Sequence, residues 1–408
     1  MSERVLTFEQ ALSEVLKHAR SSVGVRDVET VELLAGVGRV LGAAVIADRD
    51  QPPFDRSTRD GYAMRAGDVE RALRVVGSVR AGESWRGAAL AEGEAIEIMT
   101  GAPLPAGADA VVMVEHAELA DGLLRVEAGR SLLAGENVVP RGAEARAGSV
   151  VLPAGRVMGA AEIAVAASCG RAQVEVFVRP KVAIVATGDE LVELDQPMEA
   201  WQIRNSNSYA LAALVNAEGG VGERLAVARD TLEALRERVA EGREADLLLL
   251  SGGVSMGKYD LVEQVLREAG AEFLFTGALI QPGKPVVFGR LPKRDEWIYF
   301  FGLPGNPVST QVCFHLFFAP FLRALGGWTG VAPRFVEARL AEDVKGGARV
   351  TRFLPAELAG AWDGVTVRVV GWQGSGDVAA NARGNCYVVL PAGVEAFAAG
   401  ETVRVLLR

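Results

Sequence analysis

The sequence has little of the two residue types that build most disulfide and metal frameworks. It contains 3 cysteines and 3 histidines in 408 residues. The cysteines lie far apart at positions 169, 313 and 386, without a CxxC spacing, so neither a disulfide framework nor a cysteine-based zinc site is expected. The histidines are equally scattered, which argues against a histidine-rich metal site and a Ser-His-Asp triad. His315 lies in the apolar run 312–318 and is expected to be a packed residue.

Long apolar runs and an excess of basic charge are also missing. The formal net charge is -9, whereas a general nucleic-acid binder needs a basic face. No apolar run reaches the roughly 18 residues of a membrane span, and the first residues lack a secretory core region. Half of the residues are hydrophobic and 23% are charged, a composition typical of folded soluble proteins. We therefore expect a cytoplasmic enzyme that binds neither nucleic acid nor membranes.

The length predicts two to four domains, and the first of them is expected to be interrupted. Thr7 and Gln10 can form a capping box ahead of a helix that presents an apolar face from Phe8 to Ala19. Further helical stretches are expected near 31–41 and 158–168. Between them, from about 54 to 147, short β-like pieces alternate with glycine and proline. We predict an elongated, mostly helical domain (1–50 and 148–179) that holds an inserted β domain (51–147).

The region 180–328 predicts an α/β domain with a mostly parallel sheet. Apolar strands are expected at 182–186, 225–228, 246–250, 286–289 and 297–301, with helices at 208–217, 232–240, 261–268 and 308–325. Ligands of such sheets bind outside the carboxyl ends of the strands. The remaining residues, 329–408, return to a β pattern and predict a small C-terminal β domain of the barrel type.

Three loops of one kind follow strands of the α/β region. Each combines glycine with small polar residues, and glycine lets backbone N–H groups approach an anion closely. One such loop is a common turn, but three at one sheet edge favour a phosphate or another oxyanion as ligand. None is a Walker loop or a GxGxxG motif, which disfavours ordinary ATPase and dinucleotide functions. The loops contain Thr187, Gly188, Asp189, Glu190; Ser251, Gly252, Gly253, Ser255; and Pro304, Gly305, Asn306, Ser309.

A fixed lysine and several carboxylates accompany these loops. Lys284 stands between Pro282 and Pro285, a stiff turn that suits a positioned contact to an anion. Glu190, Asp230 and Asp260 lie on or near the loops, and carboxylates beside a phosphate site usually bind Mg²⁺. Helix capping is the alternative role, and it applies most readily to Asp230.

These motifs, in this order and over nearly the whole chain, resemble the molybdopterin molybdenumtransferases (the MoeA family), which include the C-terminal domain of gephyrin. The α/β loops are shared with molybdopterin adenylyltransferases and competence-damage-type proteins. The segments 54–63, with Asp60-Gly61-Tyr62, and 98–112 are the specific ones. The resemblance implies that region 180–328 is a molybdopterin-binding domain.

The resemblance also implies the last step of molybdenum-cofactor synthesis. Adenylyl-molybdopterin and molybdate would be the substrates, Mg²⁺ or another divalent metal the cofactor, and AMP a product. The enzyme would be a homodimer, with Asp60 of one subunit completing the site of the other. A molybdopterin adenylyltransferase and downstream cofactor-handling proteins are the implied partners.

By the same resemblance, the residues divide into three roles. Asp60, Glu190, Asp230 and Asp260 would be catalytic, the last three also as metal ligands. The loop residues already named, with Gly252, Gly253, Gly305 and Asn306 foremost, would bind the pterin phosphate or nucleotide. Lys284, Ser309, Arg349 and Ser375 would lie near molybdate. Arg349 is chosen over Arg352, although the spacing there differs by one residue.

One departure and three alternatives stay open from the sequence. Where family members often have a lysine three residues before Lys284, this chain has Gln281, and Arg56 or Arg59 could restore that charge across a dimer. An adenylyltransferase would share the α/β domain but would not need residues 54–147 or 329–408. A scaffold like gephyrin would not need the acidic cluster. A tungstate-handling relative cannot be separated by sequence, because the two oxyanions are nearly the same size.

Overall fold

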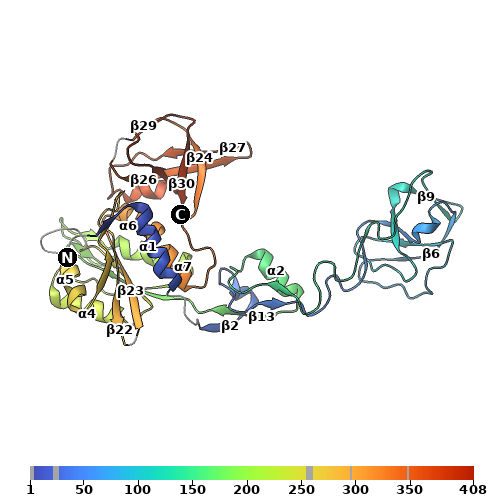
Figure 1. Cartoon of the computed structure of the whole chain (residues 1–408), viewed down its shortest axis with the longest axis horizontal. Helices are drawn as coiled ribbons and strands as arrows, with labels where there is room; N and C mark the ends of the chain where they lie inside the picture. Colours follow the sequence, from blue (N-terminus) through green and yellow to red (C-terminus); the bar gives the residue numbers. More distant parts are fainter. Residues whose placement is uncertain (1–3, 22–26, 254–260, 295, 347–348) are drawn as a thin grey trace.

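The chain is elongated, with its domains in a row (Figure 1). The computed structural model describes residues 4–21, 27–253, 261–294, 296–346 and 349–408. The α/β domain and the C-terminal domain lie side by side at one end, and the β insertion lies at the other. A narrow segment containing β2, β13 and α2 joins them.

A six-stranded mixed sheet, in the order β17–β14–β18–β23–β22–β19, forms the α/β domain. The first four strands pair in parallel. β22 pairs antiparallel with β23 on one side and with β19 on the other. A mostly parallel sheet was expected, and its parallel part includes β14, β18 and β23, which end in the predicted loops. The strands are β14 (Lys181–Ala186), β17 (Val221–Arg224), β18 (Leu247–Ser251), β19 (Glu272–Phe275), β22 (Val287–Lys293) and β23 (Glu296–Leu303).

Helices cover both faces of this sheet, as its continuous apolar strands require. Leu248 and Leu250 of β18 pack in one core cluster with α4 and α5, whereas Leu247 and Leu249 pack in another with α3 and the long helix. The helices are α3 (Ser206–Ala217), α4 (Leu232–Gly242), α5 (Leu261–Glu268), and one continuous helix made of α6 (Pro307–Cys313), a π-helical turn (Phe314–Phe318) and α7 (Ala319–Leu325).

The long helix from Pro307 to Leu325 is apolar enough to cross a membrane, but it is mostly buried inside the protein and is a core helix. His315 lies within it and is 4% exposed, as expected for a packed residue. Burial lowers the pKa of His315 to about 3, so the ring is neutral near pH 7.

The first helix, α1 (Phe8–Ser21), packs against the α/β domain. It begins with the expected capping box, in which the Thr7 N–H donates to Gln10 Oε1 at 3.0 Å and the Gln10 N–H to Thr7 Oγ1 at 3.3 Å. Its small apolar side chains, from Ala11 to Ala19, lie in the same core cluster as those of α7. The helix therefore covers the α/β sheet, although it precedes the segments of the narrow connecting domain.

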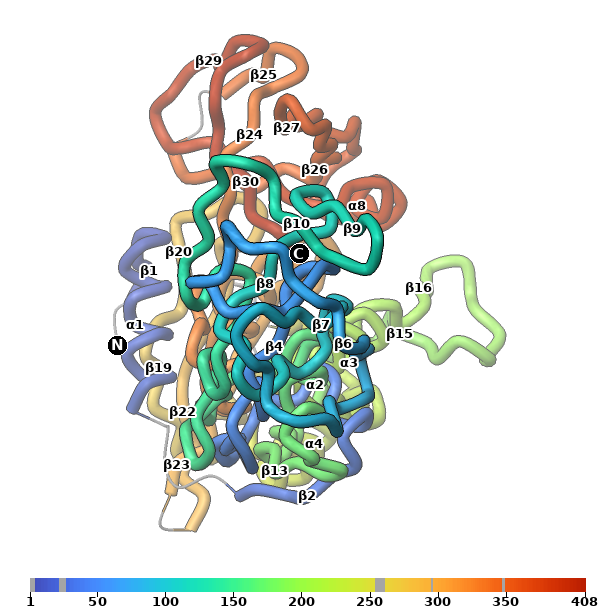
Figure 2. The backbone as a smooth tube through the Cα atoms, turned by 90° about the vertical axis from the view of Figure 1, so that its right-hand side faces the viewer, coloured from blue at the N-terminus to red at the C-terminus, as the bar shows by residue number. Residues whose placement is uncertain are grey.

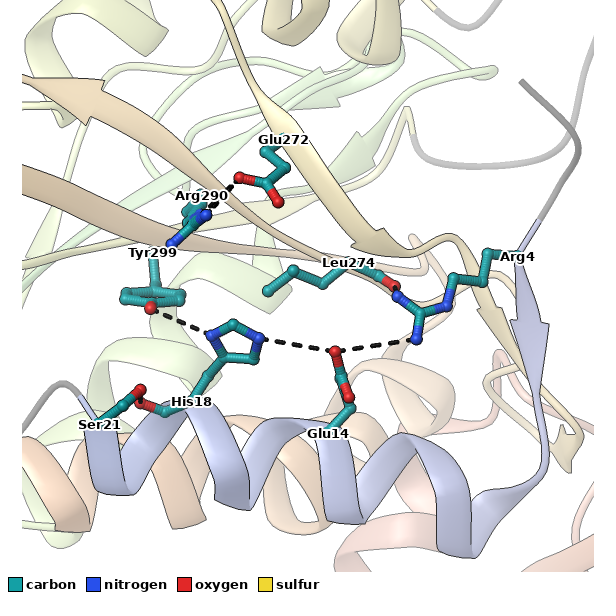
Figure 3. A network of polar contacts seen from close by, with 8 residues as sticks. All are labelled: Arg4, Glu14, His18, Ser21, Glu272, Leu274, Arg290 and Tyr299. Atoms are coloured by element: carbon teal, nitrogen blue, oxygen red, sulfur yellow. Dashed lines mark hydrogen bonds and ion pairs between the residues drawn. The ribbon is translucent and has the colours of Figure 1, made fainter.

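A polar network also ties α1 to the sheet (Figure 3). His18 Nδ1 lies 3.2 Å from the Tyr299 hydroxyl of β23, and His18 Nε2 lies 3.5 Å from Glu14. Glu14 is also 3.8 Å from the guanidinium of Arg4. Burial lowers the pKa of His18, with Glu14 acting in the opposite direction. The network ties the start of the chain to the central sheet.

The narrow domain contains more extended chain than helix, which corrects the expectation of a mostly helical domain. Residues 31–41 form the end of β2 (Val28–Glu32) and a 3-10 turn (Leu33–Gly36) instead of the expected helical stretch. β2 pairs with β13 (Gln173–Phe177), and β3 (Val45–Ile46) pairs with β12 (Val150–Leu152). The expected helix near 158–168 is present as α2 (Ala160–Ser168). In β13, buried Val174 and Val176 alternate with exposed residues, a period of two that favours a strand.

The insertion is a β domain, as predicted. Its six-stranded sheet has the order β8–β5–β7–β6–β10–β9, and a short pair of β4 with β11 lies beside it. The bounds are β4 (Arg56–Ser57), β5 (Gly61–Met64), β6 (Leu73–Val79), β7 (Glu94–Ile98), β8 (Ala110–Met113), β9 (Ala117–Ala120), β10 (Leu123–Val126) and β11 (Val138–Val139).

The C-terminal domain is a small β-barrel, as predicted. Its strands follow the order β26–β27–β24–β30–β28, and pairing of β28 with β26 closes the barrel. A strand from the α/β domain, β21 (Ile280–Gln281), adds to β26 and connects the two domains. The strands are β24 (Phe335–Leu340), β26 (Thr351–Ala361), β27 (Gly364–Val369), β28 (Cys386–Leu390) and β30 (Thr402–Leu407), and α8 (Val378–Arg383) precedes β28.

Candidate functional site

The three predicted loops meet at the carboxyl ends of β14, β18 and β23. Strand register places Ala186 beside Ser251 and Ser251 beside Leu303, so the three strands end together. The Thr187 N–H donates to Ser251 O at 3.0 Å, and the Gly252 N–H donates to Leu303 O at 3.1 Å. The sheet edge predicted to bind an anion therefore exists as one continuous surface.

A pocket of about 670 Å³ opens at this edge. Residues from all three loops and from four further segments line it. Among the residues predicted from the sequence, it contains Thr187, Gly188, Glu190, Asp230, Ser251, Gly252, Gly253, Pro304, Gly305 and Asn306. The predicted binding residues are thus brought together, with the exceptions described below.

Close backbone packing in the pocket requires glycine. Gly252 has φ +93°, and a Cβ there would lie 2.6 Å from Thr187 O. A Cβ on Gly253, at φ +62°, would lie 2.7 Å from Thr187 Oγ1. That hydroxyl oxygen is buried and has no hydrogen-bond partner within the part of the chain that the structure describes. An unsatisfied hydroxyl beside bare backbone suits a ligand oxygen as its partner.

The start of the long helix forms another wall of the pocket. Asn306 is the N-cap residue of α6, but its side chain does not cap its own helix. Instead, Asn306 Nδ2 donates to the Ser375 hydroxyl at 2.9 Å, and the Val308 N–H donates to Ser375 O at 2.9 Å. Gly376 and Val378 also line the pocket. The C-terminal domain therefore contributes residues to the pocket, whereas Ser375 itself is not among the lining residues and its predicted contact with molybdate stays a prediction.

Sequence reasoning missed the beginning of α3. Asn205, Ser206 and Asn207 line the pocket. Asn207 Nδ2 donates to Gly305 O at 2.7 Å and to the Ser251 hydroxyl at 3.1 Å, so it joins two of the loops. A run of asparagine and serine ahead of a helix, on the same sheet edge, was the available signal.

Three carboxylates gather at the rim. Glu190 and Asp230 line the pocket, and Asp189 Oδ1 accepts from the Asp230 N–H at 3.2 Å. Burial and the neighbouring charges of Asp189 and Glu190 raise the pKa of Asp230. Asp230 does not cap the next helix, because Thr231 does so by accepting from the Ala234 N–H at 3.3 Å. The capping alternative for Asp230 is therefore wrong.

The other predicted contacts lie around the pocket or outside the described residues. Lys284 is exposed, next to Pro285 of the pocket wall. Ser309 is 4% exposed within α6, and Arg349 is exposed on the C-terminal domain. Neither of these two residues lines the pocket, and nor does Asp189. Ser255 and Asp260 fall in residues 254–260, outside the described residues.

The structure also bears on the missing lysine. Gln281 in β21 is the register partner of Arg352 in β26, and the Arg352 guanidinium donates to Lys345 O at 3.2 Å. Arg56, by contrast, pairs with Glu144 at 2.9 Å, which offsets its charge. Strand register therefore places a cationic residue of the same chain next to Gln281, whereas compensation by Arg56 or Arg59 across a dimer stays a prediction.

Asp60 lies far from the pocket within one chain. It directly precedes β5 in the insertion, and the insertion lies at the opposite end of the molecule from α6 (Figure 1). Asp60 Oδ1 accepts from the Thr100 N–H at 2.6 Å and from the Thr100 hydroxyl at 2.8 Å. These bonds, the backbone one first, lower the pKa of Asp60, so it is ionised near pH 7. The two family-specific segments thus form one structure, with a fixed carboxylate.

Three family models match successive parts of the chain. The MoeA N-terminal region (domain I and II) matches residues 6–170, and the probable molybdopterin binding domain matches residues 183–324. The MoeA C-terminal region (domain IV) matches residues 337–407. Together the three models cover the narrow domain, the insertion, the α/β domain and the barrel.

Related proteins extend over the same length. A molybdopterin molybdenumtransferase of Nostoc sp. is 38% identical over 392 residues, covering 93% of this chain and 89% of that protein. One of Staphylococcus aureus is 34% identical over 386 residues, covering 93% and 90%. A crystal structure of a molybdopterin biosynthesis moeA protein from Pyrococcus horikoshii superimposes with a TM-score of 0.79 at 28% identity, covering 99% of this chain and 100% of that one. With near full-length relatives at this level of identity, the chain belongs to the molybdopterin molybdenumtransferase (MoeA) family.

Proposed function

We propose that this chain inserts molybdenum into molybdopterin by splitting adenylyl-molybdopterin, transferring molybdate to the dithiolene and releasing AMP. The observation that carries this proposal is the pocket itself, where three anion-binding loops and a group of carboxylates share one sheet edge. Phosphates suit the loops, and a hydrolysable phosphoanhydride suits carboxylates beside them.

The loops hold the phosphates in this account. Backbone N–H groups around Gly252, Gly253 and Gly305 and the free hydroxyl of Thr187 are the donors. Asn207 and Asn306 keep the loops at their separation by bridging to Gly305 and Ser375. Donors fixed in this way need no rearrangement when negative charge develops in the reaction.

The carboxylates fit a divalent metal. Within the described residues, no group of three or more acidic, histidine or cysteine side chains forms a ready-made metal cage. Mg²⁺ does not need one, because it usually takes one or two carboxylates together with substrate phosphates and water. Glu190 and Asp230, with Asp260, would hold it, and Asp189 and Glu190 add negative charge beside Asp230. When bound, Mg²⁺ would neutralise charge at the phosphoanhydride.

Molybdate would enter beside the phosphates, where Lys284, Ser309, Arg349 and Ser375 offer cationic and hydroxyl donors. Lys284 is exposed and lies in a turn between two prolines, which restrict the backbone that carries it. Ser375 is already placed at the pocket by Asn306.

Lys284→Ala should raise the molybdate KM about 10-fold and change the affinity for the pterin by less than about 2-fold. The reason is the loss of one charge-assisted contact that only the oxyanion makes. Initial rates over a molybdate series, together with pterin titration, measure the two effects. Lys293→Ala, which removes a lysine bound to Glu244 O and Ala245 O, is the matched control. A variant that loses pterin affinity instead would assign Lys284 to the other ligand.

The site is completed by a second subunit in this proposal. Asp60 is fixed and ionised, but the insertion that carries it lies at the opposite end of the molecule from the pocket. In this proposal Asp60 therefore serves the pocket of another subunit. A homodimer in which each insertion reaches the other subunit meets this requirement. The cytoplasm, where an adenylyltransferase supplies the substrate and cofactor-handling proteins receive the product, is the proposed setting.

Activation of a molybdenum-free apo-enzyme tests the proposed function. The chain, adenylyl-molybdopterin, molybdate and Mg²⁺ together should generate active cofactor, and omission of any one should prevent it. Activation by adenylyl-molybdopterin and molybdate without the chain, or no activation with it, would contradict the proposal.

A further inference from the structure

An exposed apolar segment stands beside the pocket. β15 (Leu191–Val192) and β16 (Ile203–Arg204) pair in parallel, and the chain between them projects from the α/β domain (Figure 2). Four large apolar side chains of this segment are exposed, among them Trp201 at 64% and Ile203 at 55%. An exposed tryptophan in a cluster of this kind marks a binding surface more often than a lone apolar residue does.

The base of the segment is held firmly. Arg204 Nη1 donates to Glu193 O at 2.8 Å and also to Gln196 O. The Glu193 carboxylate accepts from Asn205 Nδ2 at 3.0 Å and from the Tyr209 hydroxyl at 3.2 Å. The Gln202 N–H closes a tight turn on Glu199 O at 3.0 Å, and Trp201 lies within that turn. These bonds hold the base of the segment and the turn that carries Trp201.

The described walls of the pocket offer no flat surface on which a ring could stack. Leu191, Ile203 and Arg204 line its mouth, and no aromatic side chain is found among its described lining residues. The ring of Tyr209, which is close by on α3, has the Arg224 guanidinium over its face at 3.5 Å. Trp201 is two residues from Ile203 along the chain and has most of its surface free.

We propose that Trp201 is a stacking platform at the pocket mouth for the planar heteroaromatic ring of the ligand whose phosphates the loops hold. The inference rests on the proposed function, which supplies a ligand with phosphates at one end and a flat ring at the other. Indole is the side chain with the largest flat surface, and stacking on it needs no specific hydrogen bonds. The adenine of the AMP half and the pterin share this chemistry.

Binding of three probes to the full chain tests the platform. AMP and 6-carboxypterin each carry an anionic group and a flat ring, whereas pyrophosphate has no ring. Titration calorimetry should show that Trp201→Ala weakens the binding of one ring-bearing probe about 5- to 100-fold and leaves pyrophosphate within about 2-fold. Trp201→Phe should restore most of the affinity, because a smaller ring still stacks.

The control is Trp362→Ala, which removes a fully exposed tryptophan between β26 and β27 in the barrel. It should leave all three affinities unchanged. A loss for AMP alone assigns the platform to adenine, and a loss for 6-carboxypterin alone assigns it to the pterin. Unchanged affinity of Trp201→Ala for both ring-bearing probes would overturn the platform while leaving the proposed function intact. If the wild-type chain bound none of the three probes, the pocket assignment and the proposed function would both fail.

Discussion

Co-expressed Asp60→Ala and Glu190→Gln subunits should recover about a quarter of wild-type activity, although each variant alone should lose at least about 100-fold. Within one subunit, Asp60 and Glu190 belong to domains at opposite ends of the molecule, and the proposed site needs both carboxylates. A mixed dimer contains one site with both carboxylates and one with neither. Random pairing makes half of the dimers mixed, which gives about one quarter of all sites intact.

The control for this recovery is the doubly substituted chain, Asp60→Ala with Glu190→Gln. Paired with either single variant, it cannot assemble an intact site, so activity should stay at the level of the single variants. Turnover is measured after separating dimers by size, and thermal unfolding of each variant shows that folding is retained. If Asp60→Ala alone remained active, or if the mixture recovered nothing, the shared site would be wrong.

Gly252→Val should weaken pyrophosphate binding by more than about 100-fold. The residue has φ +93°, which L side chains rarely adopt, and its Cβ would meet Thr187 O at 2.6 Å. The loop must therefore move away from the position in which its N–H groups face the pocket. Titration calorimetry with pyrophosphate measures the loss.

A second variant separates loss of the site from loss of folding. At Gly305 an added Cβ would meet Gly252 Cα at 3.6 Å, an ordinary contact, so Gly305→Ala should fold and still place a methyl group in the cradle. We expect it to weaken pyrophosphate binding about 10-fold. Gly360→Ala, at a position where a Cβ meets nothing within 4 Å, should change neither binding nor stability. Normal binding by both pocket variants would show that the phosphates lie elsewhere.

The sequence predicted the α/β domain well because its signals are local. The strand at 246–250 and the helix at 261–268 follow from short apolar runs and a clear helical period, and β18 and α5 lie there. The expected strand at 225–228 is displaced, since β17 covers Val221–Arg224. Exposed Glu223 and Arg224 on an edge strand hide its β pattern, whereas 225–228 look more apolar.

The site was harder to predict where it depends on contacts between distant segments. The bridge from Asn207 to Gly305 joins residues 98 positions apart, and the asparagines and serines that begin α3 do not by themselves name that partner. The pairing of Gln281 with Arg352 likewise arises only because β21 leaves the α/β domain to join the barrel. In the narrow domain, β3 and β12 are too brief for a clear period, whereas the alternation in β13 was a strand signal that the expectation of a mostly helical domain did not use.

The most direct test of the account is AMP release from adenylyl-molybdopterin in the presence of Mg²⁺, with and without molybdate. We predict that AMP appears at a rate that depends on molybdate, in step with formation of active cofactor. The chain would then be acting at the phosphoanhydride and at the dithiolene in one site. Tight binding of adenylyl-molybdopterin with no AMP release under either condition would contradict the account and leave the chain as a carrier or scaffold.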